Sequence, residues 1–425
     1  MFETIDEAGA LLFLRQLIAA QREGEATVQG VVAARLAALG FAVEARRYDP
    51  ARVPMVAEFA SASAAVAGER ESVVATLAGA GGGRSVILFA HPDGEPLAGL
   101  ERWTRDPFAG EVGGGRIHGW GVADDLAGVA AGVLAFEAIA RQGIRLQGDA
   151  ILASTPSKRH ARGVSALMHE GLVADAAIYL HPAESGAGMR EIKAFCCGQV
   201  EFRVVVAGRE PETNEPSHTA FAHRATSAFD KALVVREALA RLDARRAART
   251  RHPLLEAAVG RSTKLLVGAV AAGTPGHPSR MPTRCVLECA LAFPPPETLD
   301  QVKAEVEACV AEAARADDFL AGHPPVVEWI AGTTGAETAA SHPLYRAVAD
   351  AIVATTGEAP FVNPLHTASD IRNPIVQKAI PTVGIGPLCG DLAQNGRADE
   401  WVDVADFMRA IRVVARATVA WCGAA

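Results

Sequence analysis

His91 and Asp93, in the segment FAHPDGEP, are the first residues of this sequence whose types and spacing suit metal binding. They follow a short apolar run that is typical of a buried strand, and open α/β sheets bind ligands at the carboxyl ends of their strands. In a His-x-Asp pair the imidazole binds the ion and the carboxylate supports the ring. Alone, the pair is weak evidence, because polar residues are common in loops.

A second pair of candidate ligands is Asp124 and Asp125, in the segment GWGVADDLAGVAAG. The two aspartates separate a glycine-rich turn from an Ala-rich helical pattern at residues 128–143. Aspartate is a common helix-capping residue, so one interpretation is structural. The other is that a carboxylate here binds the same ion as His91, and the combination of the two motifs favours that interpretation.

The elements that must position these residues form an α/β pattern. Buried apolar runs at 85–91, 150–154 and 175–180 predict strands, and apolar spacing at 31–39 and 128–143 predicts helices. Strands that alternate with helices in this way predict a layered α/β domain with a mixed or parallel sheet.

The middle of the chain has a different pattern. Residues 199–208, QVEFRVVVAG, alternate apolar and polar side chains, which suits a strand with one exposed face. From there the order strand, helix, strand, strand, helix, strand is the split βαβ pattern of a small α+β sandwich. We therefore predict a catalytic metal-binding α/β domain at residues 1–197 and 333–425, interrupted by an inserted domain at residues 198–332.

Composition limits the classes of protein. The chain has 425 residues, half of them hydrophobic, and a formal net charge of −8 without a basic block, so we expect no nucleic-acid partner. The acidic N-terminus does not resemble a signal peptide, and no long uncharged apolar run predicts a membrane span. The seven cysteines are scattered and include no CxxC pair, so we expect reduced thiols and a cytoplasmic protein.

AHPD, followed by ERWTRDPFAGEVGGGRIHGWGVADDLAG, resembles the zinc aminoacylase, carboxypeptidase G and succinyl-diaminopimelate desuccinylase metallopeptidase family. The likeness extends over nearly the whole chain, through PSHTAFAHRATSAFDKA and HTASDIR to ADEWVDVADF. It implies that the inserted domain is a lid that also mediates dimerisation, so we expect a homo-oligomer. It implies that His91 and Asp124 bind metal and that Asp93 is the supporting catalytic carboxylate. It also implies that His218 contacts the substrate from the lid.

Three departures from the family pattern fall in the same site. The family's adjacent glutamates, one the general base and one a ligand of a second metal, align with Ser157 and Lys158. A metal-binding histidine aligns with Gly396, and an acidic ligand aligns with His181. We therefore expect one divalent transition metal per chain, manganese or zinc, with Lys158 supplying positive charge in place of the second ion.

The third ligand and the base stay open at this point. The ion would be bound by His91, Asp124 and either His181 or Glu184, with open positions for water and substrate. Glu184 is also a candidate for the missing catalytic base.

Three functions are compatible with these residues: a catalytically dead binding protein, an amidohydrolase acting on N-acyl amino acids or dipeptides, and a repurposed hydrolase. Loss of one metal site beside an intact one favours repurposing. The resemblance is closest to a nitroaromatic branch of the family, which implies metal-dependent hydrolytic deamination of 5-nitroanthranilate to 5-nitrosalicylate and ammonia, with a small aromatic acid as substrate. Candidates for binding its carboxylate or nitro group are Arg372, Arg280, His366 and Lys158, although each arginine could instead be an ion-pair partner.

Overall fold

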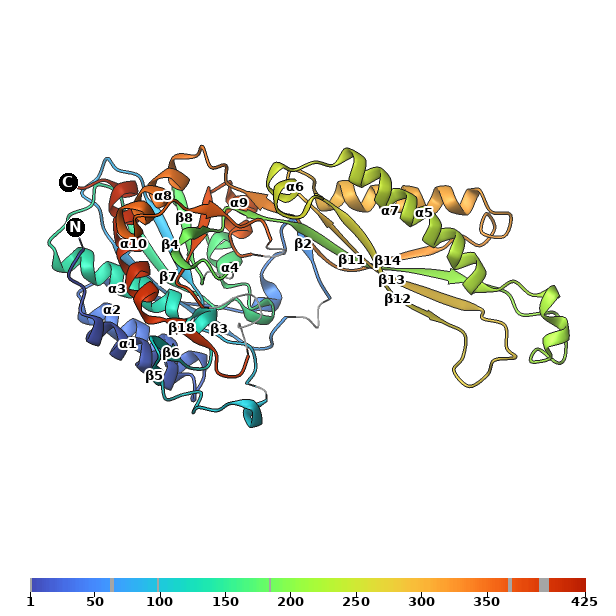
Figure 1. The fold of residues 1–425 in the computed structure, drawn as a ribbon, viewed down its shortest axis with the longest axis horizontal. Helices are drawn as coiled ribbons and strands as arrows, with labels where there is room; N and C mark the ends of the chain where they lie inside the picture. Colours follow the sequence, from blue (N-terminus) through green and yellow to red (C-terminus); the bar gives the residue numbers. More distant parts are fainter. Residues whose placement is uncertain (1, 62–64, 98, 183–184, 366–368, 390–396) are drawn as a thin grey trace.

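The computed structural model describes residues 2–61, 65–97, 99–182, 185–365, 369–389 and 397–425. It shows an elongated molecule in which an α/β domain carries an extended second domain at one end (Figure 1). Most buried hydrophobic residues fall into two large clusters: one combines residues from 2–194 and 344–422, and the other lies within residues 200–320. Within the described ranges, no helix is both long enough and apolar enough to cross a lipid bilayer.

The central sheet of the α/β domain has six strands, and only one of them runs against the others. The strand order is β1 (Ala42–Tyr48), β3 (Arg70–Leu77), β7 (Ala150–Ser154), β4 (Val86–Ala90), β8 (Ala176–Leu180) and β17 (Thr382–Ile385). β3 is antiparallel to both of its neighbours, and the remaining pairs are parallel. Leu88 of β4 packs into one hydrophobic cluster and Phe89 into another on the opposite face, which explains the uninterrupted apolar run.

Helices cover both faces of this sheet. One layer contains α1 (Glu7–Ala20), α2 (Glu25–Ala38), α3 (Ala127–Arg141), α8 (Pro343–Thr356) and α10 (Val404–Cys422). The other contains the short helices α4 (Gly163–His169) and α9 (Arg372–Lys378).

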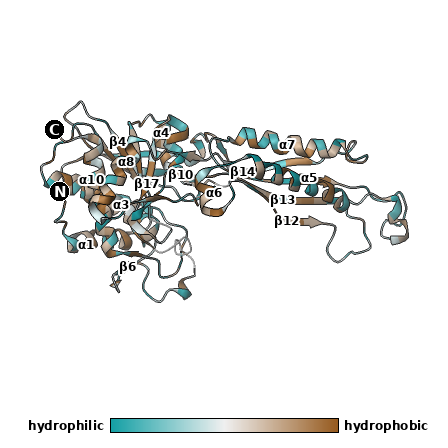
Figure 2. Ribbon diagram, turned by 45° about the horizontal axis from the view of Figure 1, so that its top comes forward, coloured by the Kyte–Doolittle hydropathy of each residue, from teal (hydrophilic) through white to brown (hydrophobic). Residues whose placement is uncertain are grey.

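The second domain is an antiparallel sheet with two helices on one face. Its strand order is β12 (Lys264–Ala272), β13 (Arg284–Phe293), β11 (Gly198–Ala207), β14 (Val326–Thr333) and β2 (Glu58–Phe59). The helices α5 (Ala228–Arg249) and α7 (Leu299–Arg315) share a hydrophobic cluster with the strands. Figure 2 shows mixed hydrophilic and hydrophobic residues along α7, as expected for a helix with one face on a sheet.

Short elements complete the structure. They are the sheet of β5 (Val112–Gly113), β6 (Arg116–His118) and β18 (Trp401–Asp403), the pairs β9 (Glu191–Ile192) with β16 (Phe361–Val362) and β10 (Phe195–Cys196) with β15 (Ala336–Glu337), and helix α6 (Pro253–Val259).

The predicted fold class, a mixed α/β domain with an inserted split βαβ domain, is confirmed. β2, from the N-terminal part of the chain, is one of the strands that were not predicted, and it pairs with β14 through Phe59 and Gly332. This pairing ties the two domains together beside the cleft described below.

Candidate metal centre

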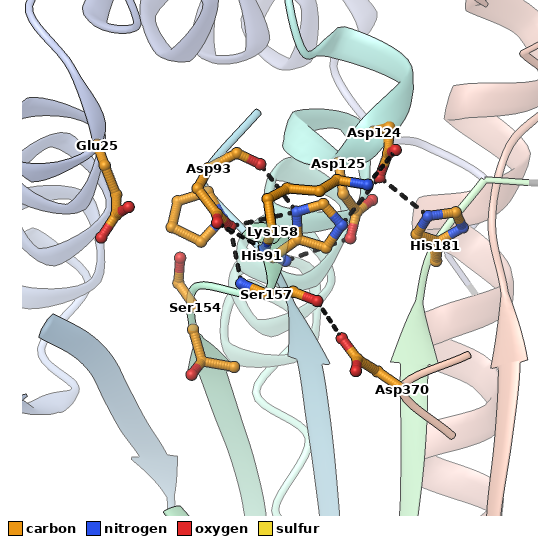
Figure 3. Close-up of polar contacts among 12 residues, drawn as sticks. Glu25, His91, Asp93, Asp124, Asp125, Ser154, Ser157, Lys158, His181 and Asp370 are labelled. Atoms are coloured by element: carbon orange, nitrogen blue, oxygen red, sulfur yellow. Dashed lines mark hydrogen bonds and ion pairs between the residues drawn. The ribbon is translucent and has the colours of Figure 1, made fainter. Parts of the chain in front are cut away.

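The candidate site lies at the carboxyl ends of three neighbouring parallel strands. His91 follows β4, Ser157 and Lys158 follow β7, and His181 follows β8. Asp124 lies just before α3 and points to the same place (Figure 3). Asp124, Ser157, Lys158 and His181 line a cleft of about 500 Å³, which also receives side chains from β11, β14 and β2 of the lid.

Three side chains offer ligand atoms to one point. His91 Nε2 is 2.9 Å and His181 Nε2 is 3.0 Å from the same oxygen, Oδ1 of Asp124, and the three ligand atoms lie within 4.8 Å of one another. His91 Nε2 is fully buried and has no properly aligned hydrogen bond despite the short distance. A buried nitrogen that faces a carboxylate without bonding it suits a shared ion. Two imidazoles and one carboxylate fit zinc or manganese.

Asp93 and Asp125 hold His91 in place. Asp93 lies 3.4 Å from His91 Nδ1 and accepts the backbone N–H groups of Ser157 and Lys158 at 2.9 and 2.7 Å. Burial disfavours the ionised form of Asp93, but its bonds to His91 and the two N–H groups outweigh burial and lower its pKa. Asp125 accepts the backbone N–H of His91 at 3.2 Å, and burial raises its pKa well above the ordinary value. These contacts orient the ligand as outer carboxylates do in metal sites.

Glu400 positions the loop that carries Asp124. Its carboxyl group accepts the backbone N–H groups of Gly121, Ala123 and Asp124 at 3.3, 2.7 and 3.1 Å. Burial, and then the nearby charge of Asp124, raise the pKa of Glu400 to about 8. Glu400 is therefore a buried acid that holds this loop through its backbone, and no sequence pattern predicted this role.

Lys158 neutralises the second oxygen of Asp124. Its Nζ contacts Asp124 Oδ2, while Oδ1 faces the two histidines. Burial alone would lower the pKa of Lys158, but the ion pair with Asp124 outweighs it and raises the pKa. Asp124 thus divides its two oxygens between a metal-binding side and a fixed ammonium group.

The turn after β7 is held in an unusual backbone conformation. Arg159, His160 and Arg162 have positive φ angles of 50°, 57° and 56°, a region that non-glycine residues rarely adopt. Such strain persists where the surrounding contacts fix it, often at functional sites. Here Arg162 donates to the carbonyl oxygen of Pro50 at 3.2 Å, and the preceding residues Ser157 and Lys158 contact Asp370 and Asp124.

Lys193 is a site residue that the sequence did not reveal. It is buried, lines the cleft, and its Nζ contacts both His181 Nδ1 and the carbonyl oxygen of Pro182. It lies between two short strands in the segment REIKAFCC, and no spacing links it to His181 before the fold is known.

Arg372 lines the cleft, but its guanidinium is already engaged. It donates to Glu58 at 2.6 Å, to Asn373, and to backbone carbonyls of residues 56, 57 and 334. These bonds join α9 to the β2 and β14 segments. The geometry therefore assigns Arg372 the alternative role of a buried ion-pair partner, and direct substrate binding would require breaking these bonds.

His218 and Arg280 are not brought to the cleft of their own chain. His218 lies in the connection from β11 to α5 and Arg280 in the connection from β12 to β13, and Arg280 Nε donates to Ser217 Oγ at 3.2 Å. These connections lie at the end of the lid sheet that is far from the α/β domain (Figure 1). Gln199 of β11 lines the cleft, and Ala207 ends that strand eight residues later, roughly 26 Å away at about 3.3 Å per residue. Glu184, His366 and Gly396, for which the sequence also made predictions, lie outside the described residues.

The model of the M20/M25/M40 peptidase family matches residues 87–420. The chain belongs to this family. Membership, together with the three-ligand centre, makes the protein a metal-dependent hydrolase. The narrower assignment to a nitroaromatic branch, and the number of ions, stay predictions.

Two relatives show how far sequence similarity reaches. N-formyl-4-amino-5-aminomethyl-2-methylpyrimidine deformylase from Halalkalibacterium halodurans is 24% identical over 353 residues, which cover 80% of this chain and 79% of the relative. Succinyl-diaminopimelate desuccinylase from Leptothrix cholodnii is 34% identical over 113 residues, which cover 27% of this chain and 26% of the relative.

Solved structures support the M20 fold over the whole chain. Aminopeptidase PepT from Bacillus cereus has a TM-score of 0.69 at 17% identity, covering 99% of this chain and 100% of that one. A dinuclear metal-binding M20 peptidase from Bacillus subtilis has a TM-score of 0.62 at 13% identity, covering 97% of each chain.

Proposed function

We propose that this protein is a one-metal hydrolase that deaminates 5-nitroanthranilate to 5-nitrosalicylate and ammonia by nucleophilic aromatic substitution. The observation that carries the proposal is that the two carboxylate oxygens of Asp124 have different partners. One oxygen faces His91 and His181, and the other is taken by the ammonium group of Lys158. A second divalent ion at that oxygen would meet a fixed positive charge.

A single zinc or manganese ion bound by His91, Asp124 and His181 would supply Lewis-acid activation of water and substrate. Asp93 and Asp125 keep His91 oriented, and Lys158 holds the second oxygen of Asp124. A flat aromatic acid bound in the cleft beside these ligands would have its reacting carbon close to the activated water, and such positioning lowers the entropic cost of the reaction.

Charge in the cleft supports an anionic substrate. Among the described lining residues there are four carboxylates and three Lys or Arg side chains, so one divalent ion leaves the lining with a net positive charge. A nitro group para to the leaving amine accepts the electron pair when hydroxide adds to the ring. A fixed cation such as Lys158 stabilises that charge where it develops.

A second candidate is hydrolysis of a small N-formyl or N-acyl amine. It is supported by the deformylase relative, which matches 80% of this chain. In the substrate named for that relative an amine is blocked by a formyl group, so the group to be cleaved is a neutral amide. The charge of the cleft therefore does not disfavour an amide substrate, but it does attract the carboxylate of an aromatic acid, which is why we place the nitroaromatic acid first.

The test is direct. Purified protein freed of metal with a chelator and reloaded with manganese or zinc should contain one ion per chain and release ammonia from 5-nitroanthranilate. Anthranilate, which lacks the nitro group, should not react. Two stoichiometric ions about 3.5–4 Å apart, or efficient cleavage of N-acyl substrates without action on the nitro compound, would contradict the proposal.

We also propose a homo-oligomer and a cytoplasmic location. β12 is an edge strand that exposes the apolar side chains of Leu266 and Val270, and an edge of this kind favours pairing with another chain. The lid tip that carries His218 and Arg280 lies far from its own cleft, so contact with substrate would come from a second copy. The seven cysteines are free thiols, which suits a reducing compartment.

A further inference from the structure

A serine–aspartate pair borders the candidate metal centre, and neither residue has a role in the mechanism above. Ser157 Oγ contacts Asp370 Oδ2, and both residues line the cleft. The backbone N–H of Ser157 is bonded to Asp93, and the next side chain, Lys158, is bonded to Asp124. Figure 3 shows the Ser157 hydroxyl turned toward Asp370 beside the ligand cluster. The hydroxyl is thus fixed by the residues that hold the metal ligands.

Asp370 differs in its partners from two other carboxylates of the cleft. Asp124 is bound to Lys158, and Glu58 is bound to Arg372 at 2.6 Å. Glu201, like Asp370, has a neutral partner, Gln199 at 3.2 Å, but it lies on β11 of the lid and has no contact with Ser157 among the described bonds.

Among the residues that the structure describes, Asp370 forms no ion pair with lysine or arginine. Its Oδ1 accepts a neutral bond from Asn373 Nδ2 at 2.9 Å, and its Oδ2 contacts the serine hydroxyl. In the described part of the chain its two carboxylate oxygens therefore contact only neutral donors.

We propose that Ser157 and Asp370 together replace the missing general base; this inference rests on the proposed hydrolytic function. As a water molecule attacks the substrate carbon, one of its O–H bonds breaks and the proton passes to Ser157 Oγ. The hydroxyl proton of Ser157 passes at the same time to Asp370 Oδ2. The hydroxide forms the new C–O bond, the C–N bond breaks, and the proton on Asp370 returns through Ser157 to the leaving nitrogen. Water and amine are thereby converted to hydroxyl compound and ammonia, with no proton gained or lost.

A purely structural role predicts a different result. The pair also joins the end of β7 to the segment before α9, so its loss could lower stability without touching chemistry. The relay instead predicts that Ser157→Ala and Asp370→Asn each reduce kcat by about 100-fold to 10,000-fold, the range for general-base catalysis, with little change in KM or in metal content. In the variants, kcat should fall less steeply at low pH than in the wild type. The solvent deuterium isotope effect on kcat should also be smaller.

The controls separate these cases. Ser85→Ala removes a similar pair, because Ser85 Oγ donates to Asp175 at 2.9 Å. Ser85 and Asp175 precede β4 and β8, at the end of the sheet away from the metal centre, so this change should leave kcat unchanged. The double variant Ser157→Glu with Asp370→Asn places one carboxylate directly beside the ligands and should recover at least tenfold of the activity lost in Asp370→Asn.

Wild-type and variant proteins are assayed on 5-nitroanthranilate and on an N-formyl amine in parallel. If wild type cleaves only the amide and the variants lose that activity, the relay stands and the proposed substrate fails. If the variants keep kcat, or lose activity only through lost metal or unfolding, the relay is overturned. A loss confined to Glu184→Gln overturns it as well, and a wild type inactive on both substrates overturns both proposals.

Discussion

Replacing Lys158 with methionine tests the ion pair on which the one-metal proposal depends. Methionine keeps much of the side-chain volume but removes the charge that contacts Asp124 Oδ2. The two side chains are only 20% and 12% exposed, so water replaces the lost partner poorly. Two unit charges 4 Å apart attract by about 4 kcal/mol at an effective dielectric constant near 20. Breaking a buried pair from one side costs roughly 3–5 kcal/mol, and we expect the metal-free variant to lose about that much.

Binding of a divalent metal ion should restore most of the stability that the Lys158→Met variant loses. A divalent ion neutralises Asp124, and in the variant it no longer faces the ammonium group across the carboxylate. Binding at 100 times Kd stabilises a protein by about 2.7 kcal/mol. We therefore expect manganese to raise the free energy of unfolding, measured by urea titration, more in Lys158→Met than in the wild type.

Lys264→Met is the matched control, because Lys264 pairs with Asp243 in the lid but its side chain is 56% exposed. Exposed ion pairs contribute about 0–1 kcal/mol, so this change should be nearly silent. Equal and small effects of both substitutions would show that the buried pair does not form in solution. The argument against a second ion would then fail.

The remaining predictions concern the ligands, the pH dependence, the domain junction and the lid edge. Asp124→Ala should abolish both metal binding and turnover, measured by metal analysis and ammonia release, because it removes the shared ligand oxygen. Burial, then Asp93, raise the pKa of Glu25 from 4.5 to about 7. Its contribution to stability is therefore full below pH 4.5 and lost as pH rises through 7, and Glu25→Gln should flatten that decline in unfolding measurements. Arg372→Ala should destabilise the protein by roughly 3–5 kcal/mol, because Glu58 loses its buried partner; unchanged stability with a raised KM would instead indicate substrate binding. Leu266→Lys at the exposed edge of β12 should shift the protein toward monomer in light scattering.

The fold was predictable because its signals are local. β4 is apolar at every position since both of its faces are buried, and β11 alternates because one face carries helices while the other does not. Two of the candidate metal ligands carry a signal of the same local kind: His91 and His181 directly follow parallel strands, whose carboxyl ends meet at one edge of the sheet.

Other parts of the site depend on contacts between distant segments. Glu400 lies 276 residues from Asp124, whose loop it anchors, and Asp370 lies 213 residues from Ser157. No sequence motif has a spacing that would predict either contact. Arg372 suited substrate recognition by residue type alone, and only the bonds to Glu58 and three carbonyl groups show where its donors go.

The substitutions at 157 and 158 are better understood as one change than as two. A lysine that neutralises Asp124 Oδ2 removes the position for a second ion, so the change at 158 goes together with the loss of that ion. The serine at 157 contacts Asp370 through its hydroxyl, and both residues line the cleft. The expected consequence is a site with less power against an unactivated amide but with fixed positive charge beside one ion. That combination suits a substrate whose own nitro group accepts the electron pair.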